Sequence, residues 1–395
     1  MKWASAMGLD ADWSTAVDSA AVRVRAGLGA ESPDLLLAFV SPHFRSAYGQ
    51  IAARLRETLP AGVFCGCSAI GVIGGGREVE QAPAVSLIGA SLPGVTVRPY
   101  FTDTVDLPDE DASPSAWTSW LGLREADGPM HFILLADPFS ANVEGFVGGL
   151  DYAFPDTVKV GGVASGAGEA GQNAIFVDEQ VYREGLLAIV LSGNVEVDTI
   201  VAQGCRPVGE PMTITCCNNN LLLEVDGSSP AAYLQQLMNR MDDYDRTLLE
   251  NSLFLGLEMD PLKGTQKQGD FLIRNLLGVD HQSGAMATGV SLHEGQVIQF
   301  HLRDKQSAAE DLQGRLDAYR REGRLEEVRG SLLFSCMGRG QYLYGAADHD
   351  SRMFQESLGD IALGGFFGNG EIGPVGASTY IHGYTSAFAL FRPAS

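Results

Sequence analysis

Short runs of apolar residues, each bounded by glycine or polar residues, recur along the chain and predict buried strands. In three places such a run is followed by a stretch of helical periodicity and then by a glycine-rich run, which is the order of a strand–helix–strand unit. The opening runs are LLLAFV at residues 35–40, HFILLAD at residues 131–137 and LLFSCMG at residues 332–338. The glycine-rich runs lie at residues 63–76, 158–168 and 364–376.

A fourth and weaker copy of this pattern spans residues 271–304, where FLIRNLL, GAMATG and QVIQFHLRD follow one another. Four copies predict two paired halves, because a repeated unit of this size buries its apolar face against a neighbour. The predicted fold class is therefore α/β, with α+β as the alternative. We expect two domains whose mixed sheets pack against helices.

Apolar residues at spacings of three and four predict further helices outside these copies. The three segments are residues 12–28, 230–249 and 307–328. The second begins after Ser229 and has Pro230 at its first position, a combination typical of a helix N-terminus. The apolar stripes of the last two indicate helices that face a core.

Two short strand-like segments predict a hairpin, because residues 211–217 and 221–225 flank a turn of three asparagines. The predicted division of the chain is an N-terminal helix in residues 1–30, a first domain in residues 31–222 and a second domain in residues 223–395.

The chain has 395 residues and a formal net charge of −22, from 27 basic and 49 acidic side chains. Its length exceeds the ~250–300 residues at which a single core stops growing, which favours two domains. The negative charge disfavours nucleic acid and anionic membranes as partners, because both are bound through Lys and Arg. No apolar run approaches the ~18–20 residues of a membrane span, and the N-terminus lacks the apolar core of a secretory signal. We expect a cytoplasmic protein without membrane insertion.

The glycine-rich run at residues 364–376 holds six glycines around one amide and one carboxylate, Asn369 and Glu371. Glycine at this density suits a backbone that a ligand approaches closely, or alternatively a buried strand that carries bulges. A carboxylate among apolar neighbours needs a partner, which is either a ligand ammonium or a cation of the protein itself.

The sequence CMGRG at residues 336–340 places Arg339 between two glycines at the carboxyl end of a buried strand, where α/β sheets commonly bind ligands. Its guanidinium suits a ligand carboxylate or phosphate. Two alternatives stay open: an exposed arginine in an ordinary turn, and an internal salt bridge between Arg339 and Glu371 that serves only the fold.

Two cysteines invite a catalytic interpretation. Cys336 could be a thiolate nucleophile with His382 or His349 as its base, and Cys67-Ser68 raises the same question. Neither lies in a catalytic signature, so inert buried thiols are favoured. The cysteine and histidine spacings predict no metal site, and no nucleotide-binding fingerprint is present. No cofactor is predicted, although a single histidine can ligate a haem iron.

Several motifs together resemble the FIST family, over roughly residue 34 to the end of the chain. They are GCSAIGVI at residues 66–73, GGVASG at 161–166, VIQF leading into HLRD at 297–304, CMGRG at 336–340, GGFFGNGEIGPVG at 364–376 and HGYTSAFALF at 382–391. The last three contain candidate residues named above, namely Arg339, Asn369 with Glu371, and His382.

The resemblance implies an N-terminal and a C-terminal FIST domain that bind small ligands inside cells, such as amino acids, and pass a signal to attached or neighbouring domains. In eukaryotes the module also occurs with F-box segments, and some bacterial members are linked to haem and gas sensing. No such output region is recognised in this sequence, so the resemblance implies signalling through a separate effector protein.

The predicted function is non-catalytic binding of a small polar metabolite, with Arg339 holding a carboxylate, Glu371 and Asn369 holding an amino group, and glycine amides completing the site. The full predicted site is Cys336, Gly338, Arg339, Gly340, Asn369, Gly370, Glu371 and His382, with Gly66, Cys67 and Ser68 as secondary candidates. The alternatives are a cysteine-dependent enzyme that uses Cys336 or Cys67, a haem-binding gas sensor, and a protein-interaction subunit.

Overall fold

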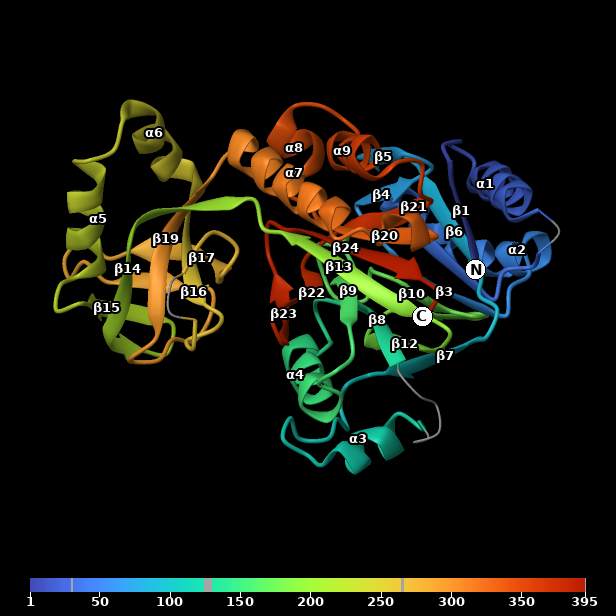
Figure 1. The fold of residues 1–395 in the computed structure, drawn as a ribbon, viewed down its shortest axis with the longest axis horizontal. Helices are drawn as coiled ribbons and strands as arrows, with labels where there is room; N and C mark the ends of the chain where they lie inside the picture. Colours follow the sequence, from blue (N-terminus) through green and yellow to red (C-terminus); the bar gives the residue numbers. More distant parts are fainter. Residues whose placement is uncertain (30, 124–129, 264–265, 395) are drawn as a thin grey trace. The chain divides into compact units, whose positions relative to one another are not determined.

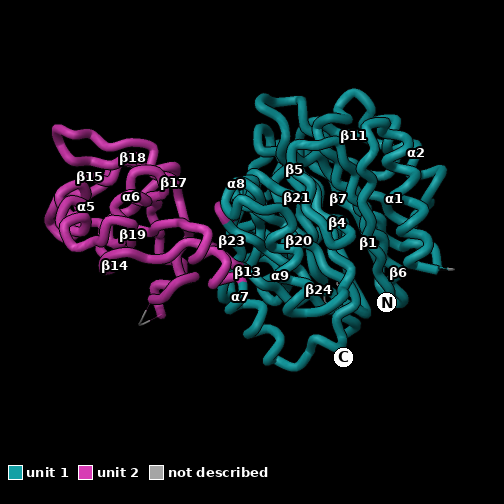
Figure 2. The backbone as a smooth tube through the Cα atoms, turned by 90° about the horizontal axis from the view of Figure 1, so that it is seen from above, with its two compact units in different colours: residues 1–201, 313–381, 385–395 teal, residues 202–312, 382–384 magenta. Residues whose placement is uncertain are grey.

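The computed structural model describes residues 1–29, 31–123, 130–263 and 266–394. The chain forms two compact units, which Figure 2 shows in different colours. The first unit contains residues 1–201, 313–381 and 385–395, and the second contains residues 202–312 and 382–384. The boundaries of the compact units therefore differ from the domain boundary at residue 222 that the sequence suggests. That boundary remains a prediction about sequence domains.

The first unit is built from three copies of one strand–helix–strand pattern (Figure 1). Copy 1 consists of β2 (Leu35–Val40), η1 (Pro42–Ala47), α2 (Tyr48–Thr58), β3 (Val63–Ser68), β4 (Gly71–Gly74), β5 (Arg77–Glu80) and β6 (Val85–Ser91). Copy 2 consists of β8 (Met130–Ala136), α4 (Val143–Ala153), β9 (Lys159–Val163), β10 (Ile175–Val177), β11 (Gln180–Tyr182) and β12 (Leu186–Gly193). Copy 3 consists of β20 (Gly330–Cys336), α8 (Gly340–Tyr344), α9 (His349–Leu358), β21 (Leu363–Gly368), β22 (Glu371–Val375), β23 (Ser378–His382) and β24 (Ser386–Arg392).

Within each copy the first strand pairs in parallel with the glycine-rich strand and antiparallel with the last strand. One glycine holds the same place in all three parallel pairs. A Cβ atom added at Gly66, Gly161 or Gly365 would lie 1.9 Å from a carbonyl oxygen of the neighbouring strand. Only glycine allows the two strands to approach this closely, and the shared contact fixes which positions of the three copies are equivalent.

The hairpins of the copies are exchanged in a cycle. Each sheet holds the core strands of one copy and, at its far edge, the hairpin of another: β10–β11 beside β3, β22–β23 beside β9, and β4–β5 beside β21. The other edges are formed by β1 (Lys2–Gly8), β7 (Val95–Thr102) and β13 (Glu196–Ala202). The hairpin of each copy therefore forms the edge of a sheet whose core strands belong to another copy.

The three sheets enclose one apolar core to which every copy contributes. The ring of Phe366 lies 5.0 Å from that of Phe39 and 5.5 Å from that of Phe334. Helices cover the outer faces: α1 (Trp13–Leu28) and α2 pack on the sheet of copy 1, whereas α3 (Pro114–Trp120) and α4 pack on that of copy 2. Phe354 of α9 stacks on Phe388 of the third sheet.

The second unit contains a closed barrel, and it corrects the prediction of four copies. Its strands are β14 (Cys205–Asn218), β15 (Leu221–Val225), β16 (Leu253–Glu258), β17 (Phe271–Val279), β18 (Met286–Thr288) and β19 (Val297–Arg303). Residues 271–304 supply β17, β18 and β19, and all the barrel pairings are antiparallel. The prediction failed because a short apolar run does not tell a parallel strand from an antiparallel one.

The helix predictions were correct in place but not always in extent. The segment 230–249 forms two helices, α5 (Pro230–Met238) and α6 (Asp243–Ser252), because Asp242 caps the second helix by accepting from the Asp245 amide. The segment 307–328 forms α7 (Lys305–Arg321) and the short helix η3 (Leu325–Glu327). The predicted hairpin is confirmed by the pairing of β14 with β15, whereas β1 was missed.

The predicted α/β class, with repeated strand–helix–strand units and mixed sheets packed against helices, is confirmed. Among the helices of the described residues, none combines the length and the apolar character that crossing a membrane requires.

Candidate functional site

The predicted residues gather where β20 and β21 end. These strands are parallel, with Cys336 opposite Gly368, and the amide of Met337 donates to the carbonyl of Gly368 at 3.0 Å. The turn that contains Arg339 therefore lies beside the turn that contains Asn369 and Glu371, as the sequence predicts for the carboxyl ends of neighbouring strands.

Asn369 is fixed by the strand end of copy 2. Its amide donates to the Val163 carbonyl at 3.0 Å, and its side-chain Nδ2 donates to the Ala164 carbonyl at 3.4 Å. The packing here is close, since a Cβ atom added at Gly162 would lie 2.9 Å from the ring of Phe366. Asn369 thus joins two copies where their glycine-rich strands end.

Glu371 is fully buried, with 0% of its surface exposed, and its Oε2 accepts from the Thr385 amide at 3.1 Å. Strand pairing makes Val72 and Ile175 the equivalents of Glu371. Each of the three residues pairs with the residue that directly follows the shared glycine, at Gly66, Gly161 or Gly365, of a neighbouring strand. A carboxylate therefore stands in copy 3 where the other two copies bury aliphatic side chains.

The Thr385 amide explains part of what Glu371 does. The equivalent amides in the other copies belong to Ala84 and Gly185. In copy 3 the Cys336 amide donates to the Thr385 carbonyl. The corresponding backbone hydrogen bonds run from Ser41 to Ala84 in copy 1 and from Asp137 to Gly185 in copy 2. The Ala84 amide donates to Ser41 Oγ at 3.0 Å and the Gly185 amide donates to Ser140 Oγ at 2.8 Å. Neutral hydroxyls thus do in copies 1 and 2 what a carboxylate does in copy 3.

Arg339 is also fully buried, with 0% exposed, and the sequence did not reveal its partners. Its Nε donates to Asp350 Oδ2 at 2.8 Å, and its Nη2 donates to Asp350 Oδ1 at 3.3 Å and to the Tyr344 hydroxyl at 2.6 Å. Burial acts to raise the pKa of Asp350, but the Arg339 charge and the hydrogen bonds from His349, Arg339 and Ser386 hold it well below its ordinary value.

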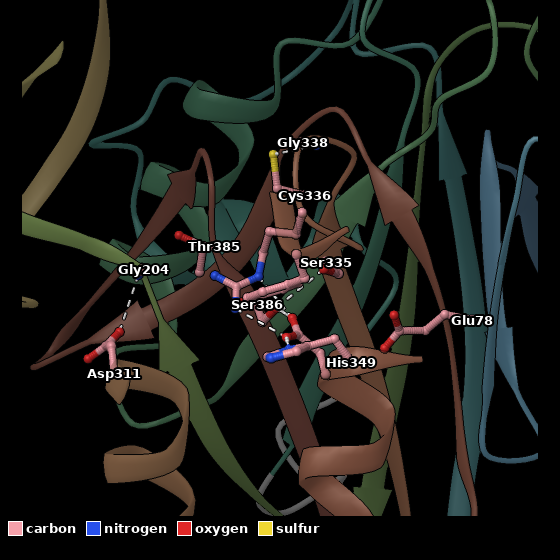
Figure 3. A network of polar contacts seen from close by, with 12 residues as sticks. Glu78, Gly204, Asp311, Ser335, Cys336, Gly338, His349, Thr385 and Ser386 are labelled. Atoms are coloured by element: carbon pink, nitrogen blue, oxygen red, sulfur yellow. Dashed lines mark hydrogen bonds and ion pairs between the residues drawn. The ribbon is translucent and has the colours of Figure 1, made fainter. Parts of the chain in front are cut away.

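The Arg339–Asp350 ion pair belongs to a polar network that reaches the strands of copy 3, and Ser335, Ser386 and His349 of this network are labelled in Figure 3. Asp350 Oδ2 accepts from Ser386 Oγ at 2.6 Å, and Ser386 Oγ lies 3.2 Å from Ser335 Oγ. His349 Nδ1 lies 2.9 Å from Asp350 Oδ1, and its ring stacks on Tyr344 at 3.4 Å. An acid eleven residues after the arginine carries no recognisable motif, so only the fold of α8 and α9 could show this pairing.

The exchanged hairpin of copy 1 adds two carboxylates beside this network. Glu78 accepts from both the amide and the hydroxyl of Ser351, at 2.6 and 2.8 Å, and Glu80 Oε1 accepts from the Gln341 amide at 2.9 Å. In return, the Glu78 amide donates to Asp348 Oδ1 at 2.6 Å. Burial, together with the charge of Asp350, raises the pKa of Glu78 to about 8.

The glycines of CMGRG have definite roles. Gly340 has φ +59°, and a Cβ atom there would lie 2.4 Å from Glu80 Oε1, so the turn requires glycine. The Gly338 amide lies 3.4 Å from Cys336 Sγ. Of the two predicted bases for Cys336, His349 is engaged with Asp350, and His382 is the buried last residue of β23.

The secondary candidates lie in a buried network of copies 1 and 2. Ser68 Oγ donates to Asn173 Oδ1 at 3.3 Å and accepts from the Ala174 amide at 3.0 Å, while Asn173 Nδ2 donates to Asp137 Oδ1 at 3.0 Å. Burial raises the pKa of the Cys67 thiol well above its ordinary value, which disfavours a thiolate. Gly66 serves strand packing, as described above.

The described part of the chain contains no cluster of three or more His, Cys, Asp or Glu side chains arranged to hold a metal ion. A surface hollow of about 420 Å³ lies between α2 and β3 and is lined by Leu36, Leu55, Phe64 and neighbouring residues, none of which belongs to the predicted site. The predicted site residues are thus packed side chains rather than the lining of this hollow.

Comparison with known proteins places the chain among sensory domains. The sequence profile of the FIST N domain matches residues 34–228 and that of the FIST C domain matches residues 230–374. An uncharacterized protein of Mycobacterium tuberculosis is 34% identical over 381 residues, which cover 96% of this chain and 97% of that protein. An uncharacterized protein of Mycobacterium bovis is 32% identical over 381 residues and 96% of each chain.

Two more distant similarities complete the comparison. F-box only protein 22 of Pongo abelii is 28% identical over 142 residues, 36% of this chain and 32% of that protein. A solved cyanuric acid hydrolase aligns over 100% of both chains with 8% identity and a TM-score of 0.34, and the hydrolase of A. caulinodans aligns with a TM-score of 0.36, 8% identity and coverage of 100% of this chain and 99% of that one. Nothing about chemistry follows from structural likeness at this level.

Proposed function

From the premise that this chain belongs to the FIST family, whose domains are sensory domains, we propose that it is a non-catalytic sensor of a small polar metabolite that carries an ammonium group, such as an amino acid. Glu371 and Asn369 receive the ammonium group at the junction of copies 2 and 3. A separate effector protein receives the signal.

The observation that carries this proposal is the carboxylate of Glu371. The Thr385 amide needs an acceptor, but the equivalent amides are satisfied by the neutral hydroxyls of Ser41 and Ser140. Burying a carboxylate costs more than burying a hydroxyl, because an ionised group loses far more hydration. Accepting a hydrogen bond from the Thr385 amide therefore does not by itself require a charge at this position, whereas recognition of a ligand cation does.

Arg339 takes a different role in this proposal from the one that its sequence suggested. Its guanidinium is fully buried and bound to Asp350 and Tyr344, so it presents no exposed face to a ligand carboxylate. Breaking its ion pair with Asp350 to make room would cost about 3–5 kcal/mol. We assign Arg339 the task of holding the CMGRG turn against Asn369 and Glu371, and the ligand carboxylate is met by backbone amides.

The close packing around Glu371 gives the sensor its response. Since a ligand must part side chains that are already in contact, binding and a local rearrangement occur together. The turn that moves is joined to Glu78 and Glu80 of copy 1 through α8 and α9, so a change at Glu371 reaches an exchanged hairpin.

Thermal unfolding in the presence of each of the common amino acids tests the proposal. We expect one class of amine ligands to raise the melting temperature saturably in the wild type and in the control Glu356→Gln, which alters an exposed glutamate of α9. Glu371→Gln retains an acceptor for Thr385 but loses the charge, so it should keep the unliganded stability and lose the shift. An undiminished shift in Glu371→Gln, or the absence of a shift with every amine, overturns the assignment.

A further inference from the structure

Two arginines at the junction of copies 1 and 2 reach the same short loop. Arg45 of η1 donates from Nη1 to Gln172 Oε1 and from Nη2 to the Gly166 carbonyl, both at 2.7 Å. Arg183, directly after β11, donates from Nη1 to the Asn173 carbonyl at 3.2 Å. Because Gln172 and Asn173 are consecutive residues, the two guanidinium groups bind adjacent residues of the loop.

Neither guanidinium has a carboxylate partner among the described residues. The groups that accept their hydrogen bonds are an amide side chain and two carbonyls, all neutral. The acid nearest in this loop, Glu169, accepts from the Gln172 amide instead. In a chain with 49 acidic and 27 basic residues, two neighbouring arginines without an acid are unusual.

The two groups also retain unused donors that point to a ligand. A guanidinium carries five N–H donors, and these hydrogen bonds use two on Arg45 and one on Arg183. The Nε of Arg45 is buried and has no hydrogen-bond partner in the described structure. An unmet buried donor on a cation costs free energy unless an anion or water accepts from it.

Tyr48 forms the floor of this site. Its side chain is buried beneath Arg183, whose guanidinium carbon lies 5.4 Å from the centre of the ring, and its edge packs against Phe176 at 5.7 Å. Burial raises the pKa of Tyr48 to about 12, although the charges of Arg45 and Arg183 both act to lower it. The tyrosine therefore stays neutral and presents the face of its ring to Arg183.

We propose that Arg45 and Arg183 form a binding site for a small oxyanion, the carboxylate or phosphate group of a metabolite, above the ring of Tyr48. Two guanidinium groups on either side of an oxyanion supply charge-assisted hydrogen bonds from several directions. Arg183 is exposed and Arg45 half-buried, so the anion enters from solvent. The residues are distinct from Glu371 and Asn369, and the site stands whether or not the amine proposal holds.

Isothermal titration calorimetry of the full chain with inorganic phosphate and, separately, with succinate tests this site, with chloride held at a fixed concentration. We expect saturable binding of at least one anion, weakened about tenfold or more by Arg183→Gln and by Arg45→Gln, since each charge-assisted bond is worth more than about 1.4 kcal/mol. The anion that binds more tightly identifies the group that the site recognises.

The matched control is Arg56→Gln, which removes an arginine that is already paired with Glu179 of the same hairpin and should leave the affinity unchanged. Because Arg45 also braces the loop, its variant can lose stability; Arg183→Gln removes an exposed side chain and separates the two effects. Arg183→Lys retains the positive charge but loses the planar, bidentate hydrogen-bonding geometry of the guanidinium, so this variant should bind the anion with intermediate affinity. Equal affinity in the wild type and Arg183→Gln, or no saturable binding of either anion by the wild type, overturns the proposal.

Discussion

Two buried acidic residues of the first unit differ in how burial of their charge is avoided or compensated. The charge of Asp350 is neutralised by Arg339, at 2.8 Å, and its Oδ2 also accepts a hydrogen bond from the Ser386 hydroxyl. Among the described residues no cation pairs with Glu78, which accepts instead from Ser351, and burial raises its pKa to about 8, so it keeps its proton at a pH where glutamate is ordinarily ionised. Each of these two arrangements leads to a separate prediction for the stability of a variant.

Glu78→Gln should remove a pH dependence. The pKa of Glu78 is raised from 4.5 to about 8, so the folded state binds this proton more tightly than the unfolded state does. The free energy of unfolding therefore falls as pH rises from about 4.5 to about 8, by at most about 1.4 kcal/mol per pH unit. The glutamine keeps an acceptor for Ser351 and does not titrate, so its stability should decline less over this range.

Urea unfolding at several pH values between these limits measures the effect. The exposed Glu356→Gln serves as the control and should follow the wild type. If the wild type and Glu78→Gln decline in parallel, Glu78 is ionised in the folded state and the explanation is wrong.

Arg339→Met should destabilise the fold by about 3–5 kcal/mol, because it leaves Asp350 buried without its cation. Adding Asp350→Asn to this variant should restore part of the loss, since the uncompensated charge is then gone. Chemical denaturation of the two single variants and the double variant forms a thermodynamic cycle. Additive effects would mean that the two side chains do not stabilise each other.

At the scale of elements, a comparison of equivalent residues in the three copies distinguishes residues that the fold requires in every copy from residues that occur in one copy alone. Gly66, Gly161 and Gly365 are required in every copy by the approach of the parallel strands. Glu371 has no acidic counterpart, since Val72 and Ile175 hold its place in the other hairpins. Comparison within the chain thus supports a special role for Glu371 and a common structural role for the glycines.

A rescue experiment tests the equivalence itself. Glu371→Val introduces the residue type of the other copies but leaves the Thr385 amide without its acceptor, which costs about 1–3 kcal/mol. Cys336 stands where Ser41 stands in copy 1, and Ser41 Oγ accepts from the corresponding amide. We therefore expect Cys336→Ser to recover stability in the Glu371→Val background.

The same Cys336→Ser change in the wild type is the control and should have little effect, because Glu371 already accepts from Thr385. Thermal unfolding of the four proteins is sufficient. No recovery in the double variant would show that the serine does not reach the Thr385 amide and that the copies differ more than their pairing suggests.

The sequence predicted most strands and helices of the first unit but not how they combine. Apolar runs at residues 35–40 and 332–338 identified buried strands because those strands are covered on both faces. The barrel strands have similar composition and were assigned to a fourth copy for that reason. The pairing of Arg339 with Asp350 could not be foreseen, because it depends on how α8 and α9 fold. The contact of Glu78 with Ser351 could not be foreseen either, because hairpin exchange joins residues that are 273 positions apart.

At the scale of the whole molecule, the two compact units differ in how their strands are distributed along the chain. All six strands of the barrel lie within residues 205–303, whereas the sheets of the first unit combine segments from both ends of the sequence. Residues 1–201 alone lack β21, the partner of β4, and β22, the partner of β9. The barrel has no such missing partner.

Fragments of the chain should therefore behave differently. We expect residues 202–312 to unfold cooperatively when expressed alone, since the barrel closes on itself. Residues 1–201 should aggregate or unfold without a cooperative transition, because unpaired strand edges and an incomplete core are exposed. Denaturant titrations followed by circular dichroism, with the full chain for comparison, check both statements. A cooperative transition in the fragment 1–201 would contradict the importance of the exchanged hairpins.

The cyclic exchange of hairpins also limits how such a chain can change its length during evolution. In solenoid proteins a repeat can be gained or lost at an end, because each repeat contacts only its neighbours. Here the hairpin of copy 1 completes the sheet of copy 3, so the array has no end at which a copy can be added. An insertion between copies leaves this exchange intact, and the barrel lies at such a position, between β13 and β20.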